Sequence, residues 1–130
     1  MFGNYSVQIE AFAERHFIKS FEKKYKSKWD LTLISITEGL ARIDNLLKTD
    51  RAETITDADD IKIIKTKFRV VDTKESATTS GNRCIVAWCA SKQLVSVLLV
   101  YGKTDLSGKH ETVTWKALVK ENYPEYSKIL

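Results

Sequence analysis

The sequence predicts one α+β domain, with an antiparallel sheet packed on an N-terminal helix hairpin in the element order β-α-α-β-β-β-α. Three observations support this fold class. Apolar residues recur at helical spacing between residues 12 and 47, the apolar period changes to two after residue 60, and the 130 residues contain no internal repeat or linker. A chain of this length is too short for two comfortable domains, so residues 1–130 are expected to form a single unit.

The first half of the chain predicts a short strand and two helices. Residues 5–9 alternate in polarity and are expected to form an edge strand. The apolar residues of the first helix are Phe12, Phe17, Phe21 and Tyr25. Those of the second form a stripe from Trp29 to Leu47, at intervals of three and four residues, and Ser27 with Asp30 can cap its start. Because little chain separates the two helices, we expect them to form a hairpin.

The second half predicts three strands and a closing helix. Residues 49–60 are polar and acidic, so they are expected to form a loop. The strands, in which the apolar period is two and Val, Ile and aromatic residues are frequent, are 61–71, 83–90 and 94–103. The long polar loop 72–82 joins the first two, and a short hairpin connection near 91–93 joins the last two. Residues 111–121 are predicted to form the closing helix.

The composition excludes several classes of protein. Hydrophobic residues make up 43% and charged residues 29% with one proline, which is typical of a globular domain. No apolar run approaches the ~20 residues of a membrane span. Glu10 and Glu14 lie where a signal peptide would be apolar, so we expect a cytoplasmic protein. Cys84 and Cys89 should face opposite sides of one strand and cannot bridge each other. The chain lacks the ligands of a zinc site, and no metal or cofactor is predicted.

The positive charge is concentrated in the second half of the chain. The net charge is +4, but residues 1–60 hold 9 basic and 11 acidic residues, whereas residues 61–130 hold 12 basic and 6 acidic residues. Strand alternation puts Lys65, Lys67 and Arg69 on the open face of the sheet, away from the helix hairpin. A meander should then bring five residues to one end of that sheet, followed on a loop by His110: Lys67, Arg69, Arg83, Tyr101 and Lys103. Arg83 and Tyr101 share a face only if paired residue numbers sum to an even value. The charge pattern by itself favours an ordinary solvated face that protects a sheet edge.

Three motifs, in their order and spacing, are similar to the RelE/ParE superfamily of toxins from bacterial toxin–antitoxin modules. They are KTKFRV (65–70), SGNRCIVAW (80–88) and VLLVYGKTD (97–105). In that superfamily a basic strand likewise leads through a polar loop, ending near Gly-x-Arg, to a strand that carries tyrosine and lysine. The resemblance covers most of residues 12–121 and implies a RelE-like fold, with a helix hairpin before the sheet.

The resemblance implies a ribosome-dependent endoribonuclease that cuts messenger RNA and is neutralised by a cognate antitoxin protein. The ribosome and mRNA would be its other partners. In this reaction a 2′-hydroxyl attacks the scissile phosphate, and clustered Lys and Arg stabilise the phosphorane without a metal. The implied catalytic positions are Lys67, Arg69, Arg83 and Tyr101, and the implied RNA-binding positions are Lys65, Lys103 and His110.

Two alternatives stay open. Relatives of the ParE type keep the fold but bind DNA gyrase and cut no RNA, and a basic interaction domain without toxicity would carry the same charges. The nuclease hypothesis requires Arg83 and Tyr101 on one face with Lys67 or Arg69. The gyrase hypothesis tolerates their dispersal, and the third hypothesis predicts no growth arrest.

Overall fold

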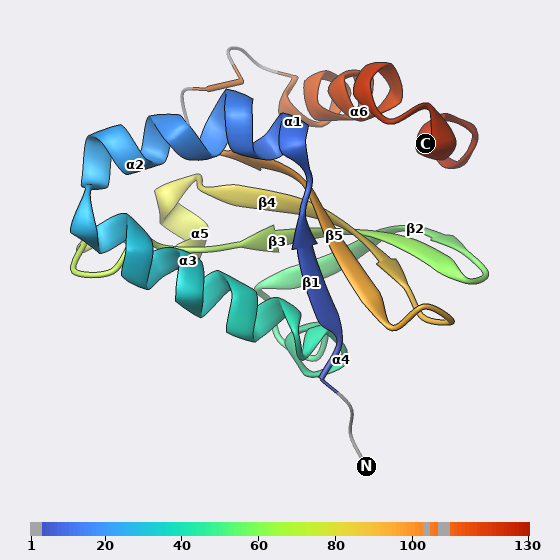
Figure 1. Ribbon diagram of the computed structural model, residues 1–130, viewed down its shortest axis with the longest axis horizontal. Coiled ribbons are helices and arrows are strands. Elements are labelled where there is room, and N and C mark those ends of the chain that lie inside the picture. The colour runs from blue at the N-terminus through green and yellow to red at the C-terminus, as the bar shows by residue number, and fades with distance from the viewer. Residues whose placement is uncertain (1–3, 103–104, 107–109) are drawn as a thin grey trace.

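A five-stranded sheet forms the centre of the protein (Figure 1). The structure, a computed structural model, describes residues 4–102, 105–106 and 110–130. The strands, in the spatial order β1-β5-β4-β3-β2, are β1 (Ser6–Ile9), β2 (Ala52–Ala58), β3 (Ile61–Lys67), β4 (Arg83–Cys89) and β5 (Leu94–Tyr101). β1 pairs with β5 in parallel, and the other three pairings are antiparallel.

The sheet is therefore mixed, and the prediction of an antiparallel sheet on an N-terminal helix hairpin is wrong, although the class α+β holds. The chain begins with strand β1, and the N-terminal helices come after it. β1 and β5 run in the same direction, because Ser6 lies beside Leu94 and Ile9 beside Val97. Side chains alternate with the same period in parallel and antiparallel strands, so the alternation in the sequence does not reveal strand direction.

Residues 11–25 form one helical segment that contains a π turn. It comprises α1 (Ala11–Ala13), the π turn η1 (Glu14–Ile18) and α2 (Lys19–Tyr25). Phe12 and Phe17 are five residues apart, one more than an α-helical face allows. The π turn, in which Lys19 donates its N–H to the carbonyl of Glu14, compensates for that extra residue. The two phenylalanine rings consequently meet edge to face, with their centroids 5.9 Å apart.

The predicted second helix is divided into two. α3 (Ser27–Leu40) starts after Lys26, whose positive φ of 54° separates it from α2, and no side chain caps this start. The expected cap by Ser27 is therefore absent. At the other end, the carbonyl of Ala41 accepts the N–H of Tyr5 at 2.7 Å, and the chain leaves the helix before the separate turn α4 (Ile43–Leu46).

Two elements lie in segments that were predicted to be loops. β2 occupies most of the predicted loop 49–60 and forms a hairpin with β3, with Asp59 in the left-handed region at φ 56°. Because β2 is an edge strand, its polar residues stay largely exposed and produce no apolar period. The single turn α5 (Ala77–Ser80) is held by a capping box between Ser76 and Thr79.

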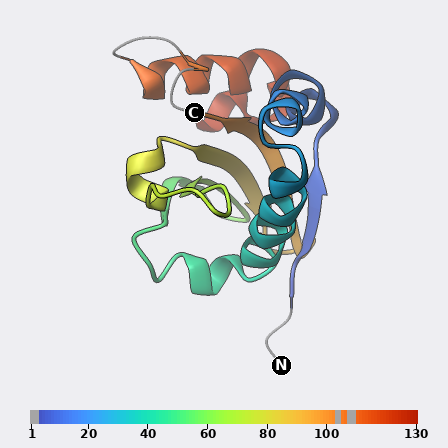
Figure 2. The same ribbon diagram turned by 90° about the vertical axis from the view of Figure 1, so that its left-hand side faces the viewer.

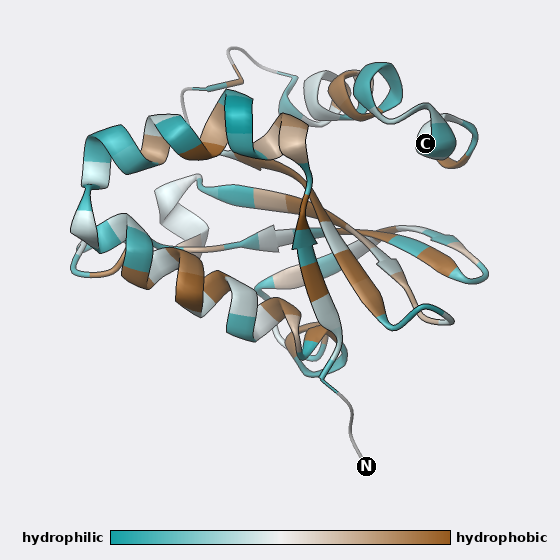
Figure 3. Cartoon of the chain, in the orientation of Figure 1, coloured by the Kyte–Doolittle hydropathy of each residue, from teal (hydrophilic) through white to brown (hydrophobic). Residues whose placement is uncertain are grey.

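Both faces of the sheet are covered by helices. One face, which includes Val86, packs on the segments α1 to α4 around Trp29. The other, which includes Ile85, packs through Trp115 and Val119 on α6 (Glu111–Asn122) and on the following 3₁₀ segment η2 (Pro124–Ile129). Figure 2 shows α3 and α6 on different sides of the sheet, and Figure 3 shows that β5 is hydrophobic along much of its length. Among the described residues, no helix is both long and apolar enough to span a bilayer.

Candidate active site

A row of three polar side chains crosses the sheet near the start of α6. Lys67, the last residue of β3, lies opposite Arg83, the first residue of β4. Arg83 lies in turn opposite Tyr101, the last residue of β5. Directly opposed residues on neighbouring strands share a face. The row therefore joins three of the residues that the sequence analysis singled out.

A β-bulge places Tyr101 on this face. Val86 pairs with Val97 and Ile85 with Leu99, so Leu98 is one extra residue in β5. Before the bulge, Val97 contacts the core under α1 to α4, whereas after it Leu99 and Tyr101 face α6. Arg83 and Tyr101 pair with residue numbers that sum to an even value, which is the condition for the two side chains to share a face. On the other side of the bulge, Val86 and Val97 pair with an odd sum, so the condition is met only beyond the bulge.

The face that carries the row is not open, contrary to the sequence-based expectation. Tyr101 is only 1% exposed, and its ring belongs to the core formed with Leu106, Trp115 and Val119. The sequence predicted the closing helix but not that it covers this face. A ring buried in this way cannot stack on an RNA base, so the hydroxyl is the part of Tyr101 that can act in the site.

The Tyr101 hydroxyl contacts a carboxylate that the sequence analysis did not select. It donates a hydrogen bond of 2.6 Å to Oε2 of Glu111, the first residue of α6. The Lys65 ammonium lies 3.2 Å from the same oxygen. The Lys65 side chain is 17% exposed and the Glu111 side chain 41%, so the carboxylate is fixed from the protein side and still reaches solvent.

These contacts keep the tyrosine neutral and the glutamate ionised. Burial raises the pKa of Tyr101 far above its ordinary value, and the hydrogen bond and charge of Glu111 act in the same direction. Burial by itself would raise the pKa of Glu111 as well. The hydrogen bonds from Tyr101 and Lys65, together with the charges of Lys65 and Arg83, outweigh that effect and lower the pKa. At neutral pH the site therefore presents a carboxylate and no phenolate.

Arg83 is held by three backbone carbonyls at the base of α5. One of its terminal nitrogens donates to Ala77 at 3.1 Å and to Asn82 at 2.9 Å, and the other donates to Thr78 at 3.1 Å. These bonds occupy three of the five guanidinium N–H groups, and because the acceptors are neutral carbonyls they leave the positive charge of Arg83 uncompensated. Arg83 is consequently oriented by the loop that precedes β4, and its charge acts on both Tyr101 and Glu111.

The other site residues that the sequence analysis proposed either lie around the cluster of Arg83, Tyr101 and Glu111 or fall outside the residues that the structure describes. Lys67 is half-buried, at the end of the row. Arg69 is exposed and lies two residues beyond the end of β3, where it borders a separate cavity with Lys67. His110 is exposed at the start of α6. Lys103 lies outside the residues that the structure describes.

Glu111 could have been found only by its position relative to Tyr101. Acidic residues are common in the first turn of a helix because they face its positive dipole end, so the type of residue carries no signal. The sequence places Glu111 ten residues after Tyr101, at the start of the predicted closing helix. A helix that folds back across the end of β5 brings the two together. In the described part of the chain, no group of three or more His, Cys, Asp or Glu residues could hold a metal ion.

Comparison with known proteins supports the fold. No family model matches the sequence, and no curated protein matches it significantly. Among solved structures, the chain is similar to one in the crystal structure of the archaeal RelE–RelB complex from Pyrococcus horikoshii OT3. The TM-score is 0.55 at 10% sequence identity, and the match covers 78% of this chain and 98% of that chain. The protein therefore has a RelE-like fold, and at this identity the likeness extends to the fold alone.

Proposed function

We propose that the protein is the toxin of a toxin–antitoxin module and cleaves messenger RNA on the ribosome. The observation that carries the proposal is the cluster of Lys65, Lys67, Arg83, Tyr101 and Glu111 at one end of a RelE-like sheet. The cluster combines a solvent-accessible carboxylate with several cations, which are the groups that phosphodiester cleavage by an internal nucleophile needs.

Each step of the proposed reaction has a group in the cluster. Glu111 accepts the proton of the 2′-hydroxyl, and the bond from that oxygen to phosphorus forms. The charge on the phosphorane is stabilised by Arg83 and Lys67. The bond from phosphorus to the 5′-oxygen breaks, and the Lys67 ammonium supplies the proton to the leaving oxygen. The products are a 2′,3′-cyclic phosphate and a 5′-hydroxyl.

Two further residues position the carboxylate. Tyr101 and Lys65 hold the same oxygen of Glu111, at 2.6 Å and 3.2 Å, so they act through Glu111 and not on the RNA. Their bonds also lower the pKa of Glu111, which keeps the base unprotonated at neutral pH. In this proposal Tyr101 is therefore a positioning residue, and it supplies neither a proton nor a stacking surface to the RNA.

A cognate antitoxin is part of the proposal, because an active toxin would arrest the cell that makes it. The chain similar to this one comes from a complex of RelE with RelB. Residues 61–130 carry twice as many basic as acidic residues, 12 against 6, so a neutralising segment of the antitoxin should be acidic and amphipathic.

A toxin that binds a protein target without cleaving RNA is the second candidate function. One observation favours it: Arg83 already donates three hydrogen bonds to backbone carbonyls, which is the arrangement of a structural arginine. In this case Glu111→Gln would leave growth arrest unchanged.

Cleavage of message on programmed ribosomes tests the nuclease proposal. Purified protein and its Glu111→Gln variant are incubated with ribosomes that carry a defined message, and the ends of the fragments are identified. The wild type should leave 2′,3′-cyclic phosphate ends, and Glu111→Gln should cut about 10²–10⁴-fold more slowly. Lys120→Gln, at an exposed position further along α6, is the matched control and should retain the wild-type rate. A wild-type protein that leaves the message intact would overturn the proposal.

A further inference from the structure

A cavity of about 440 Å³ lies under α3 and α4, at the edge of the sheet where β3 extends beyond β2. Its size is in the range of small-molecule sites. Apolar side chains that include Leu40, Leu46 and Phe68 line part of it. Ser35 and Asn45 contribute hydroxyl and amide groups. A ligand that fits such a surface has a flat apolar part and hydrogen-bonding edges.

Four cations surround this cavity, against a single carboxylate. The cations are Arg42, Arg51, Lys67 and Arg69, and the carboxylate is Glu38. Three of the four cations are exposed and Lys67 is half-buried. Within the described residues, none of the four forms an ion pair or a side-chain hydrogen bond, unlike Lys65, which pairs with Glu111. The lining therefore has a net positive charge, which favours an anionic ligand.

The four cations come from three separate segments that the fold brings together. Arg42 lies between α3 and α4, Arg51 precedes β2, and Lys67 and Arg69 lie at the end of β3. The N–H of Lys67 donates to the carbonyl of Arg51 at 2.8 Å, so these two residues are fixed relative to one another. A sheet edge that needed only solubility would gain nothing from cations gathered around one cavity.

Lys67 belongs both to this cavity and to the row with Arg83. The row lies on the face covered by α6 and the cavity on the face covered by α3 and α4, so a nucleic-acid strand with its scissile phosphate beside Arg83 would enter the cavity by passing around the end of β3 at Lys67. Arginine guanidinium groups bind phosphate and also stack on bases. Proteins recognise single-stranded RNA through bases that are splayed out of the strand and stack on such groups.

We infer that the cavity under α3 and α4 binds one nucleotide unit, with its base against the half-buried Ile36 and Leu46 and its phosphate on Arg42, Arg51 and Arg69. The inference rests on the proposed function for the identity of the strand, but its test does not depend on cleavage. The same chemistry could come from a free mononucleotide or from one unit of a strand, and the two are separated by the choice of probe.

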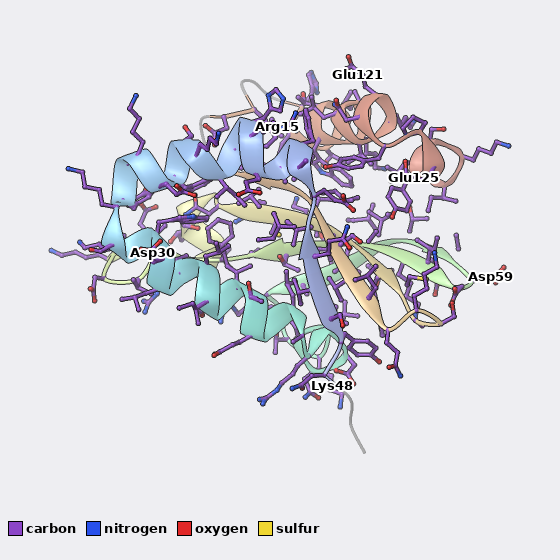
Figure 4. The ribbon with its side chains drawn as sticks, viewed as in Figure 1. Arg15, Asp30, Lys48, Asp59, Glu121 and Glu125 are labelled. Atoms are coloured by element: carbon purple, nitrogen blue, oxygen red, sulfur yellow. The ribbon has the colours of Figure 1, made fainter. Side chains whose placement is uncertain are left out.

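Gly39 offers a way to fill the cavity without disturbing the core. It lies on α3 in the cavity lining, and a Cβ added there would meet no atom within 4 Å. Gly39→Trp should therefore occupy the cavity or its mouth, and Gly39→Ala is the matched control. Arg51→Glu removes one phosphate contact at an exposed position. Arg15→Glu makes the same change of charge at the opposite end of the molecule, where Figure 4 shows Arg15 on the upper helical segment, away from Lys48 beside α4.

Binding is measured by calorimetry, with a short single-stranded oligonucleotide of 2′-deoxy units that cannot be cleaved, with 5′-mononucleotides and with inorganic phosphate. We expect the wild type and Gly39→Ala to bind the oligonucleotide equally. Arg51→Glu should bind about tenfold or more weakly, because one charge-assisted contact is lost. Gly39→Trp should bind at least about tenfold more weakly, because the indole occupies the cavity, and Arg15→Glu should differ little from the wild type.

Each other outcome contradicts part of the inference. If Gly39→Trp binds like the wild type, or Arg15→Glu loses as much as Arg51→Glu, the cavity is not the site. If mononucleotides bind as tightly as the oligonucleotide, the ligand is a free nucleotide and not one unit of a strand. If inorganic phosphate binds as tightly as the mononucleotides, the base makes no contribution to binding. Protein that binds as expected but leaves message uncut on ribosomes would contradict the proposed nuclease function and not this inference.

Discussion

Removing one oxygen atom by Tyr101→Phe tests the account of the site most directly. The lost hydroxyl donates a 2.6 Å hydrogen bond to an ionised carboxylate, a class of bond that contributes about 1.5–3 kcal/mol to stability. Because the Glu111 side chain is 41% exposed, water replaces part of the lost bond, and we expect a loss at or somewhat below the lower limit of this range, about 1–1.5 kcal/mol. For a chain of this size that corresponds to a fall in Tm of roughly 3–6 °C.

The pH dependence gives this prediction a second, independent signature. The pKa of Glu111 is lowered in the folded state, so its stabilising contribution is present above the unfolded value and is lost as the pH falls through the folded value. The pKa of Tyr101 is raised, so its contribution is present below about 10 and is lost as the pH rises further. The difference in unfolding free energy between the wild type and Tyr101→Phe should therefore be largest near neutral pH and smaller at both extremes.

Urea denaturation followed by circular dichroism, from pH 3.5 to pH 11, measures this difference. The control is Tyr25→Phe, at a half-buried tyrosine whose hydroxyl has no hydrogen bond within the described residues. In the cleavage assay, the acidic limb of the pH–rate profile should move to higher pH in Tyr101→Phe, because Glu111 loses a donor that favours its ionised form. A stability difference near zero at pH 7, or one that does not change with pH, would refute the assigned role of the Tyr101–Glu111 bond.

Three further predictions concern Arg83, the two cysteines and Gly39. Arg83→Ala should lower the unfolding free energy by about 1–3 kcal/mol in urea titrations, since three carbonyl contacts are lost, and Arg83→Lys should recover only part of it; full stability of Arg83→Ala would contradict the bonding described. Burial raises the pKa of Cys84 to about 12, and Cys89 is only partly buried. A thiol reagent at about pH 8 should therefore modify Cys89 in the native protein and both cysteines only after unfolding. Rapid reaction of two thiols in the native protein would contradict the burial of Cys84. Gly39→Ala should raise the Tm slightly, because alanine is a better helix former than glycine, by up to about 1 kcal/mol in a helix interior and by less in the last turn of α3, and the added methyl has free space. A lower Tm would show that the space is occupied.

The sequence predicts the elements of this fold better than their arrangement. β4, β5 and α6 lie close to the predicted ranges, because their apolar residues are buried on both faces of the sheet and against a helix. β2 escapes notice because an edge strand needs few apolar residues. The parallel pairing of β1 with β5 is invisible to local patterns, since it joins residues about 90 positions apart, such as Ser6 and Leu94.

The candidate site could be predicted in the same partial way. Strand alternation and meander topology bring Lys67, Arg83 and Tyr101 into one row, and the register shows that they are directly opposed. The bulge at Leu98 that makes this possible has no glycine or other marker in the sequence. Glu111 depends on how α6 crosses the end of β5, which is a tertiary arrangement and leaves no local pattern.

The burial of Tyr101 links the bulge, the helix and the chemistry of the site. If β5 alternated regularly through Leu98, Tyr101 would stay on the face of Val97, under α1 to α4, on the side of the sheet away from α6. Because of the bulge, the ring enters the core beside Trp115, and only the hydroxyl reaches the carboxylate. The packing of the Tyr101 ring in the aromatic core thus fixes the position of its hydroxyl, and the hydrogen bond from that hydroxyl fixes the position of the Glu111 carboxylate. If Glu111 is the base of the proposed reaction, its attachment to a buried side chain means that it needs no reorganisation when the RNA binds, which is the property expected of a catalytic carboxylate.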